Sequence, residues 1–298
     1  MTPLILPMPG NEALAQSLAD QLDGEVGAVE TRQFPDGESY IRLITPVAGR
    51  SVVFVCTLDR PDGKLLPLIF AAGAAKELRA AKVGLVAPYL AYMRQDKRFQ
   101  EGEAVTSSHF ASILNGWFDW MATVDPHLHR RTSLSEIYTM PTATLHAAGA
   151  IADWIRDEVD KPVLVGPDGE SEQWVAAVAE DVGCPHTVLL KTRHGDRDVE
   201  VSVPDVGAWR DHTPILIDDI ISTARTMIET VGHLKRAGMQ PPICIGVHAV
   251  FAGDAYRALS NAGTGQIVTC NTIPHASNAI DLAGLLAGGV SGFLHTAR

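Results

Sequence analysis

The stretch ILIDDIISTARTM, residues 215–227, places two adjacent acids directly after an apolar run and follows them with hydroxyl residues. A short Ile/Leu run bounded by polar residues is typical of a buried strand. The overlapping segment TMIETVGHLKRAG, residues 226–238, has its apolar residues on one helical face and ends in Lys and Arg before Gly238, a regular C-terminal signal. The stretch therefore predicts a buried strand, a short polar loop and a helix.

The same alternation runs along the whole chain, as in parallel βαβ units. Strands are predicted at residues 51–58, 83–90, 162–166, 215–217 and 243–251, and helices at residues 11–22, 65–81, 144–159, 171–182 and 226–238. Residues 3–22 and 161–182 are weakly alike, since each runs from a strand through a Pro/Gly turn into an amphipathic helix. We therefore predict an α/β fold of two similar domains, residues 1–140 and 141–298, with the last segment packing back on the first domain.

Composition and charge exclude several classes of protein. The net charge of −11 argues against non-specific nucleic-acid binding, which needs basic surface. The apolar runs stop well before the ~20 residues that a membrane span needs, and the N-terminus has no basic leader. The four cysteines are far apart, with no CxxC spacing, which indicates reduced thiols. We expect a cytoplasmic protein without a membrane or nucleic-acid partner.

The acids Asp218 and Asp219 allow two interpretations. Ligands of open α/β sheets bind beyond the carboxyl ends of the strands, and the following helix start favours an anion. A sugar phosphate suits both features, because its diol can bind the acids and its phosphate the amides and hydroxyls. The alternative is a solvated strand end in which Thr223 or Thr226 serves as the helix N-cap.

Five segments together resemble one family. ILIDDIISTARTM resembles the phosphoribosyl pyrophosphate loop of the phosphoribosyltransferase-type fold, and four further segments narrow the match to the ribose-phosphate pyrophosphokinase family: FPDGESYIRL (34–43), YMRQDKRF (92–99), TVDPHLH (123–129) and VGPDG (165–169). The resemblance implies two phosphoribosyltransferase-type domains, each with a mainly parallel sheet flanked by helices. It also implies Mg²⁺-dependent transfer of the β,γ-diphosphoryl group of ATP to the 1-hydroxyl of ribose 5-phosphate, which yields phosphoribosyl pyrophosphate (PRPP) and AMP. Such transfer depends mainly on positioning and charge neutralisation.

In the first of these segments, the resemblance makes Phe34 an adenine-stacking residue and assigns reading of the base to Asp36 and Glu38. The family extends this segment into the ATP site of a neighbouring subunit, which implies a homo-oligomer, a dimer or a hexamer, with a shared ATP site. Taken by itself, Pro-Asp-Gly indicates a β-hairpin turn.

The resemblance assigns further residues to ATP and metal. Arg94, Gln95 and Asp96 match the run that contacts ATP, and His127 matches the histidine that helps to hold metal and nucleotide phosphates. Asp168 matches an aspartate near Mg²⁺ and the ribose. Because Mg²⁺ prefers oxygen ligands, Asp168 is the better candidate for the metal.

Lys191 and Arg193 fit the mobile-loop cations that the family uses to stabilise the transferring group. A spacing of two places both on one side of an extended segment. Without the resemblance, a solvated charged loop is the simpler interpretation.

For the sugar phosphate, the resemblance implies that Asp218 and Asp219 hold the ribose diol. The loop assigned to the 5-phosphate comprises Ser222, Thr223, Ala224, Arg225 and Thr226. The family usually reads Thr-Gly-Gly-Thr where this chain has Thr-Ala-Arg-Thr, and glycine permits positive φ and close approach to phosphate. The change implies either a less demanding turn or a different 5′ substituent, as in ADP-ribose. A non-catalytic regulatory homologue is a third reading.

Overall fold

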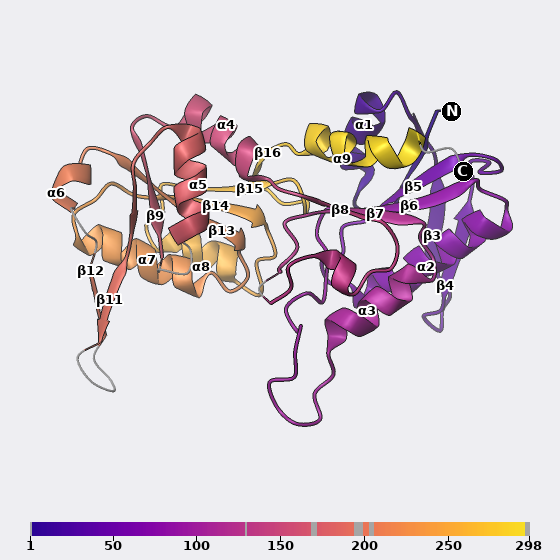
Figure 1. The fold of residues 1–298 in the computed structure, drawn as a ribbon, viewed down its shortest axis with the longest axis horizontal. Coiled ribbons are helices and arrows are strands. Elements are labelled where there is room, and N and C mark those ends of the chain that lie inside the picture. The colour runs from indigo at the N-terminus through magenta and orange to yellow at the C-terminus, as the bar shows by residue number, and fades with distance from the viewer. Residues whose placement is uncertain (1, 129, 168–171, 194–198, 203–205, 296–298) are drawn as a thin grey trace. The chain divides into compact units, whose positions relative to one another are not determined.

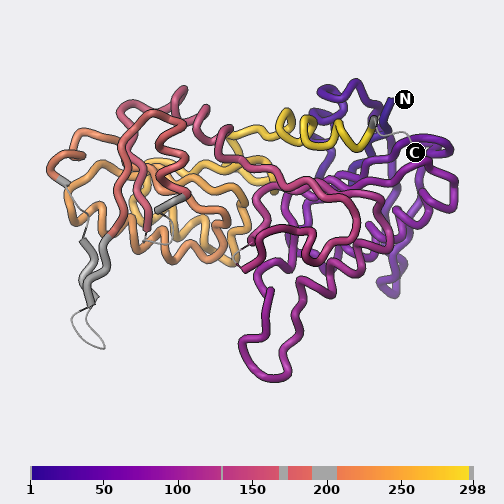
Figure 2. Tube along the Cα trace, in the orientation of Figure 1, coloured from indigo at the N-terminus to yellow at the C-terminus, as the bar shows by residue number. Residues whose placement is uncertain are grey.

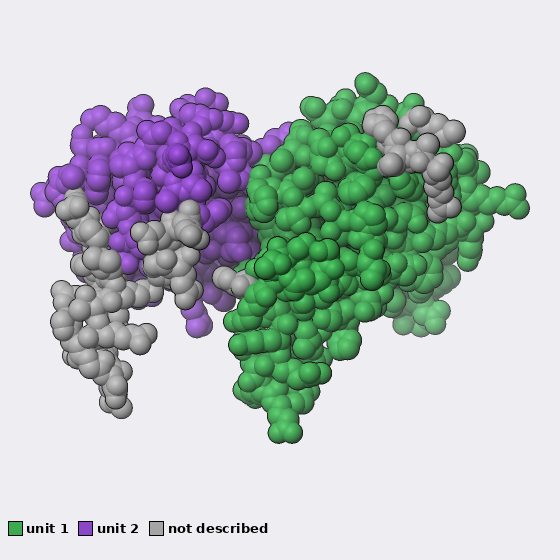
Figure 3. Space-filling view, viewed as in Figure 1, with its two compact units in different colours: residues 1–146, 272–274, 282–298 green, residues 147–271, 275–281 purple. Residues whose placement is uncertain are grey.

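The computed structural model describes residues 2–128, 130–167, 172–193, 199–202 and 206–295. The chain forms two compact units (Figure 3). Unit 1 comprises residues 1–146, 272–274 and 282–298, and unit 2 comprises residues 147–271 and 275–281.

Unit 1 is built on a six-stranded sheet whose neighbouring strands are all parallel. In spatial order the strands are β2 (Glu25–Val26), β1 (Leu4–Pro7), β5 (Ser51–Val55), β6 (Lys82–Ala87), β7 (Trp120–Val124) and β8 (Thr142–Leu145). Most residues of β1, β5, β6 and β7 are buried, because helices cover both faces of the sheet.

Unit 2 repeats this arrangement with a second six-stranded parallel sheet. Its spatial order is β10 (His186–Val188), β9 (Pro162–Gly166), β13 (Thr213–Ile220), β14 (Ile243–His248), β15 (Gln266–Cys270) and β16 (Asn278–Ile280). The strands of the two sheets correspond position by position, with β1 matching β9 and β5 matching β13. The prediction of two similar, mainly parallel α/β domains is confirmed.

The helices lie on both faces of each sheet (Figures 1 and 2). The connection from β1 to β2 and the connection from β5 to β6 run toward opposite edges of the sheet. Because both crossovers are right-handed, their helices lie on opposite faces. In unit 1 the helices are α1 (Glu12–Gln21) and α9 (Ala283–His295), which pack together, and α2 (Asp62–Glu77) and α3 (Thr106–Asn115), with the short η1 (Leu134–Glu136). In unit 2 they are α4 (Ala148–Glu158) packed on α5 (Glu172–Val182), α7 (Arg225–Arg236) packed on α8 (Ala255–Asn261), and the short α6 (Val206–Trp209).

Each unit also carries an antiparallel hairpin at the same point of its topology. β3 (Val29–Gln33) and β4 (Ser39–Leu43) lie between β2 and β5, and β11 (Leu190–Arg193) and β12 (Val199–Ser202) lie between β10 and β13. The internal repeat therefore includes the hairpins, which the weak sequence similarity did not indicate.

Two boundaries differ from the sequence prediction. Residues 142–145 form β8, which pairs with β7, so the helix expected at residues 144–159 begins only at Ala148. For the same reason the units divide between residues 146 and 147, after the expected boundary at residue 140. None of the helices in the described part of the chain combines the length and apolar character that crossing a bilayer requires. All four cysteines are free thiols.

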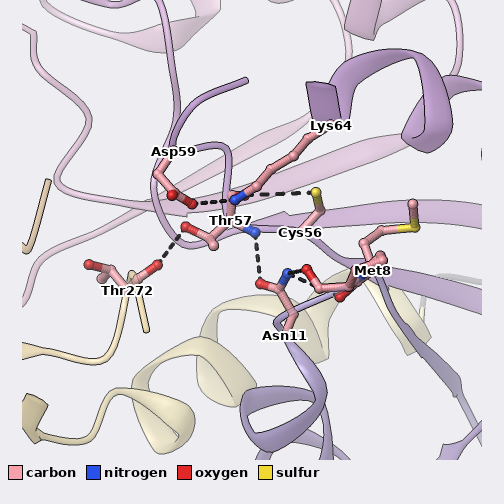
Figure 4. Close-up of polar contacts among 8 residues, drawn as sticks. Met8, Asn11, Cys56, Thr57, Asp59, Lys64 and Thr272 are labelled. Atoms are coloured by element: carbon pink, nitrogen blue, oxygen red, sulfur yellow. Dashed lines mark hydrogen bonds and ion pairs between the residues drawn. The ribbon is translucent and has the colours of Figure 1, made fainter. Parts of the chain in front are cut away.

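A buried polar junction ties distant segments of unit 1 together (Figure 4). Asn11 Oδ1 accepts a hydrogen bond from the Thr57 amide at 2.8 Å, and Thr57 Oγ1 donates to the carbonyl of Thr272 at 2.7 Å. Lys64 donates to the Thr57 carbonyl and pairs with Asp59. The returning segment 272–274 is thus held at Thr272 by a buried hydrogen bond from Thr57.

We expect Gly84→Ala to destabilise unit 1 by about 3 kcal/mol, because an added Cβ would lie 2.1 Å from the buried Trp120 indole. Trp120 cannot move aside, since it stacks on Phe293 with ring centroids 4.9 Å apart. Urea denaturation measures the change. Gly149→Ala is the control: its Cβ meets open space, and we expect a neutral or stabilising effect of up to about 1 kcal/mol. Equal stability of the two variants would contradict this packing.

Candidate active site

The two acids of the opening stretch lie at the carboxyl end of a central strand. β13 extends through Asp218 and Asp219 to Ile220, and Asp218 is in register with Gly246 of β14. Strands β9 and β14 flank β13 on either side, so both acids sit in the middle of the sheet edge. This is the position at which parallel α/β sheets bind ligands.

Asp218 is an electrostatically costly residue. Burial raises its pKa to about 7, and both the side-chain hydrogen bond that the protonated Asp218 shares with Asp219 and the negative charge of Asp219 act in the same direction. The pair therefore favours one shared proton or the approach of hydroxyl or cationic groups. This chemistry does not suit a plain solvated strand end.

The loop after the acids contains a left-handed residue. Ala224 has φ 58° and ψ 11° and is the N-cap of α7, with no side-chain cap hydrogen bond. The alternative in which Thr223 or Thr226 caps this helix is therefore wrong. The possibility of a less demanding turn is also wrong, because Ala224 adopts the conformation that glycine would favour.

The side chains of this loop surround the start of α7. Thr223, Arg225 and Thr226 are exposed, and the half-buried Ser222 accepts a hydrogen bond at its carbonyl from the Ala252 amide at 3.0 Å. A small pocket beside them is lined by Asp218 and Thr226 together with Pro167, Leu216, Ile217, Met227 and Thr230. The structure thus brings one of the two acids and a loop hydroxyl to the same hollow.

In unit 1, Phe34, Asp36 and Glu38 form the tip of the β3–β4 hairpin. The Phe34 amide donates to the Glu38 carbonyl at 2.8 Å, and Asp36 Oδ1 accepts from the Glu38 amide at 3.2 Å. The Pro-Asp-Gly turn is confirmed. The Phe34 ring is 40% exposed and lies under the Arg32 guanidinium at 4.7 Å, so the tip presents an aromatic face and two exposed acids.

The segment with Arg94, Gln95 and Asp96 lies between β6 and α3. Arg94 is exposed, and Gln95 Oε1 accepts a hydrogen bond from Thr106 Oγ1 at 3.2 Å. Asp96, also predicted to contact ATP, is mostly buried in this structure. Its side chain is only 4% exposed and pairs with Arg130 at 2.9 Å, so its carboxylate is committed inside the protein.

The remaining predicted residues are described only in part. His127 is half-buried in the loop that follows β7. Asp168 lies outside the described residues, and Lys191 and Arg193 are described only as backbone of β11. Within the described ranges, no three His, Cys, Asp or Glu side chains gather closely enough to hold a metal ion.

Arg130 and Arg131 are site-adjacent residues that the sequence reading passed over. Arg130 pairs with Asp96, and Arg131 donates to Ser107 and Ser108 at 3.3 Å each. The only signal in the sequence is their position, three and four residues after His127. Two adjacent cations in a loop are ordinarily read as solvated surface.

Comparison with known proteins agrees with this geometry. Residues 4–116 match the family model for the N-terminal domain of ribose phosphate pyrophosphokinase, and residues 133–283 match that for the phosphoribosyl transferase domain. The crystal structure of phosphoribosylpyrophosphate synthetase from Mycobacterium smegmatis is similar over 100% of both chains, with a TM-score of 0.85 at 23% identity. The fold and site thus define a transferase built from two phosphoribosyltransferase-type domains.

Curated relatives are similar over nearly the full length. Ribose-phosphate pyrophosphokinase of Methanothermobacter thermautotrophicus is 33% identical over 95% of this chain and 98% of its own. The enzyme of Methanobrevibacter smithii is 31% identical over the same shares, and that of Methanosarcina mazei is 31% identical over 97% and 95%. The chain belongs to the ribose-phosphate pyrophosphokinase family.

The raised pKa of Asp218 predicts that stability falls as pH rises. Between the ordinary carboxyl range and about pH 7, the folded chain keeps a proton that the unfolded chain has lost. An asparagine at this position cannot ionise, so Asp218→Asn removes this loss of stability. We expect the free energy of unfolding of the variant, relative to the wild type, to rise by about 2 kcal/mol from pH 5 to pH 8. Denaturant titrations at several pH values measure it. An advantage that is constant with pH would contradict the assignment.

The left-handed Ala224 predicts a second effect. We expect Ala224→Val to destabilise by about 2 kcal/mol, because a β-branched side chain is strained at φ 58°. Ala224→Gly serves as the matched variant and is expected to lie within about 1 kcal/mol of the wild type. Thermal unfolding of the three proteins measures the difference. Valine and glycine variants of equal stability would show that the turn is not left-handed.

Proposed function

We propose that this ribose-phosphate pyrophosphokinase transfers the β,γ-diphosphoryl group of ATP to the 1-hydroxyl of ribose 5-phosphate and releases PRPP and AMP. PRPP is the form in which ribose phosphate enters nucleotide biosynthesis. The observation that carries the proposal is the β13–α7 loop. It combines a pair of adjacent carboxylates, one with a raised pKa, with a left-handed turn and exposed hydroxyls.

The two ends of the sugar phosphate require opposite chemistry. Asp218 and Asp219 accept hydrogen bonds from the two adjacent ribose hydroxyls, which offsets the cost of keeping the carboxylates ionised side by side. The loop from Ser222 to Thr226 surrounds the 5-phosphate with the amides at the start of α7, the Thr223 and Thr226 hydroxyls and the Arg225 guanidinium. Arg225 thus supplies charge at a position where the family usually has glycine.

ATP binds to unit 1 in this proposal. Arg94 forks onto a phosphate and Gln95 bonds to the nucleoside, while His127 lies against the phosphates. Phe34 stacks on adenine, and Asp36 and Glu38 read the base. Asp96 belongs to the same segment but, being buried, acts on ATP through the position of its neighbours.

The β3–β4 hairpin serves a neighbouring subunit in this proposal, so that the enzyme is a homo-oligomer with shared ATP sites. An exposed Phe34 at a hairpin tip is compatible with it, since aromatic residues are enriched at protein interfaces. A dimer or a hexamer satisfies the same requirement.

Lys191 and Arg193 stabilise the negative charge of the group in transfer. Both residues belong to β11, two positions apart along the strand. We expect Lys191→Met to lower kcat far more than it raises either KM, because the interaction is made only in the transition state.

Mg²⁺ is the cofactor in this proposal, and Asp168 would hold it, with His127 as the second candidate from this chain. Mg²⁺ typically takes one or two carboxylates plus phosphate oxygens and water, so the absence of a three-ligand cluster from the described residues is compatible with it. When bound, the ion neutralises the diphosphoryl charge and orients it for in-line attack.

ADP-ribose is the competing acceptor, suggested by the altered phosphate loop. The left-handed Ala224 disfavours it, because the loop keeps a backbone conformation that the usual family glycine would favour. AMP release from ATP and Mg²⁺, with each acceptor offered separately, decides between them. Release with ribose 5-phosphate supports the proposal, and release with ADP-ribose alone would reject it.

Asp218→Asn tests the role assigned to the acids. We expect KM for ribose 5-phosphate to rise about 10-fold to 100-fold, since one charged hydrogen bond is worth about 1.5–3 kcal/mol, while KM for ATP stays within about twofold. Initial rates of AMP release measure both constants. Asp254→Asn, an exposed acid at the start of α8, is the control. An unchanged KM for the sugar would refute the diol contact.

A further inference from the structure

The segment proposed to bind ATP is a long connection between β6 and α3, residues 88–105, with little regular structure of its own. The α3 end of this connection is held by the Ser107 amide, which donates to the Gln95 carbonyl at 3.3 Å, and by Thr106, which donates to the Gln95 side chain. Both hydrogen bonds come from the first turn of α3. Something further must fix Arg94 and Gln95, because a loop displaced by 1 Å loses most of its catalytic value.

Arg131 enters this region from a different part of the chain, the connection between β7 and η1. Its Nη2 donates to Ser107 Oγ and Ser108 Oγ at 3.3 Å each, with a longer contact of 3.5 Å to the Asp96 carbonyl. One guanidinium nitrogen therefore touches both the first turn of α3 and the ATP segment. Arg130 adds a second tie through the Asp96 carboxylate.

This placement of Arg131 is costly. Its side chain is 15% exposed, and its nearest carboxylate, Glu136, is 3.7 Å from Nη1. Its Nε is buried, and none of the described residues accepts a hydrogen bond from it. A mostly buried cation with incomplete partners destabilises a fold. Stability therefore does not account for Arg131.

The location of Arg131 suggests why a costly residue is present there. β6 and β7 are adjacent parallel strands, so the segments that follow them leave the same edge of the sheet. The first carries Arg94 and Gln95, and the second carries His127 four residues before Arg131. The Arg131 guanidinium thus bridges the two segments assigned to ATP.

We infer that Arg131 is a positioning residue for ATP: it locks the Arg94–Asp96 segment to the start of α3 and to the His127 loop. The inference rests on the proposed assignment of these segments to ATP. Arg131 itself is too buried to be the nucleotide ligand. Its Nη2 reaches three acceptors while Nη1 faces Glu136, and a lysine ammonium, with a single nitrogen, cannot reproduce this division.

The test compares Arg131→Met with Arg131→Lys by initial rates of AMP release and by calorimetric titration with Mg-ATP. We expect methionine to raise KM and Kd for ATP about 10-fold or more, with KM for ribose 5-phosphate within about twofold. Lysine should recover part of the loss, to within about fivefold of the wild type. Arg257→Met, an exposed arginine of α8, is the matched control.

Ser107→Ala/Ser108→Ala keeps the arginine and removes two of its acceptors, so it tests the inference if Arg131→Met fails to fold. We expect a threefold or greater rise in Kd for ATP with unchanged far-UV circular dichroism. Unchanged Kd in the folded variants, or equal rises in KM for both substrates, would overturn the inference. A wild type that binds ATP but does not turn over with ribose 5-phosphate would instead refute the proposed function, and the Kd comparison would still decide the role of Arg131.

Discussion

Parallel strand pairing is the constraint on which the site of each unit depends. Because β9, β13 and β14 run in one direction, their carboxyl ends meet at one edge, and the residues that follow them are gathered there. The same pairing of β6 with β7 in unit 1 brings two segments together that are far apart in the chain. Burial of both sheet faces stabilises the strands, while the edge is left free for polar chemistry.

Charge is kept at these edges at a cost to stability. The raised pKa of Asp218 shows that the folded chain holds this carboxylate where ionisation is unfavourable. Arg131 is a positive counterpart: it is a mostly buried cation whose Nε has no hydrogen-bond acceptor among the described residues. A buried charge that lowers the stability of the free enzyme is useful in two cases. Either the ligand supplies the partner that the charge lacks, or the charged residue positions other residues that contact the ligand. Both residues fit an enzyme whose substrates are sugar and nucleotide phosphates.

Much of the architecture was predictable from local pattern. Apolar runs bounded by Gly and Pro marked β5, β6, β9 and β14, and the Pro-Asp-Gly turn marked the first hairpin. Prediction failed where pairing overrode local preference. Thr142–Leu145 reads Thr-Ala-Thr-Leu and precedes a strongly helical segment, but it forms the edge strand β8 because β7 offers unpaired backbone groups. The hairpin of unit 2 was missed although Val199–Ser202 alternates apolar and polar residues, because the charged residues before it favoured a loop.

The sequence proposed candidate site residues but not their arrangement. The double acid was proposed from its position at a predicted strand end, whereas the RQD segment and the phosphate loop were assigned by the resemblance to the family. The burial of Asp96 could not be predicted, since an Asp beside Arg and Gln reads as an exposed ligand until Arg130 is found beside it.

The sequence by itself determined the succession of strands and helices, the acids at the end of β13 and membership of the family, because these depend on neighbours along the chain. Only the tertiary structure decided that Ala224 is left-handed, that Asp218 resists ionisation and that Arg131 joins two loops. Each of these follows from contacts between residues that are remote in sequence or from the backbone path that such contacts impose. The local sequence pattern indicates neither these contacts nor this backbone path.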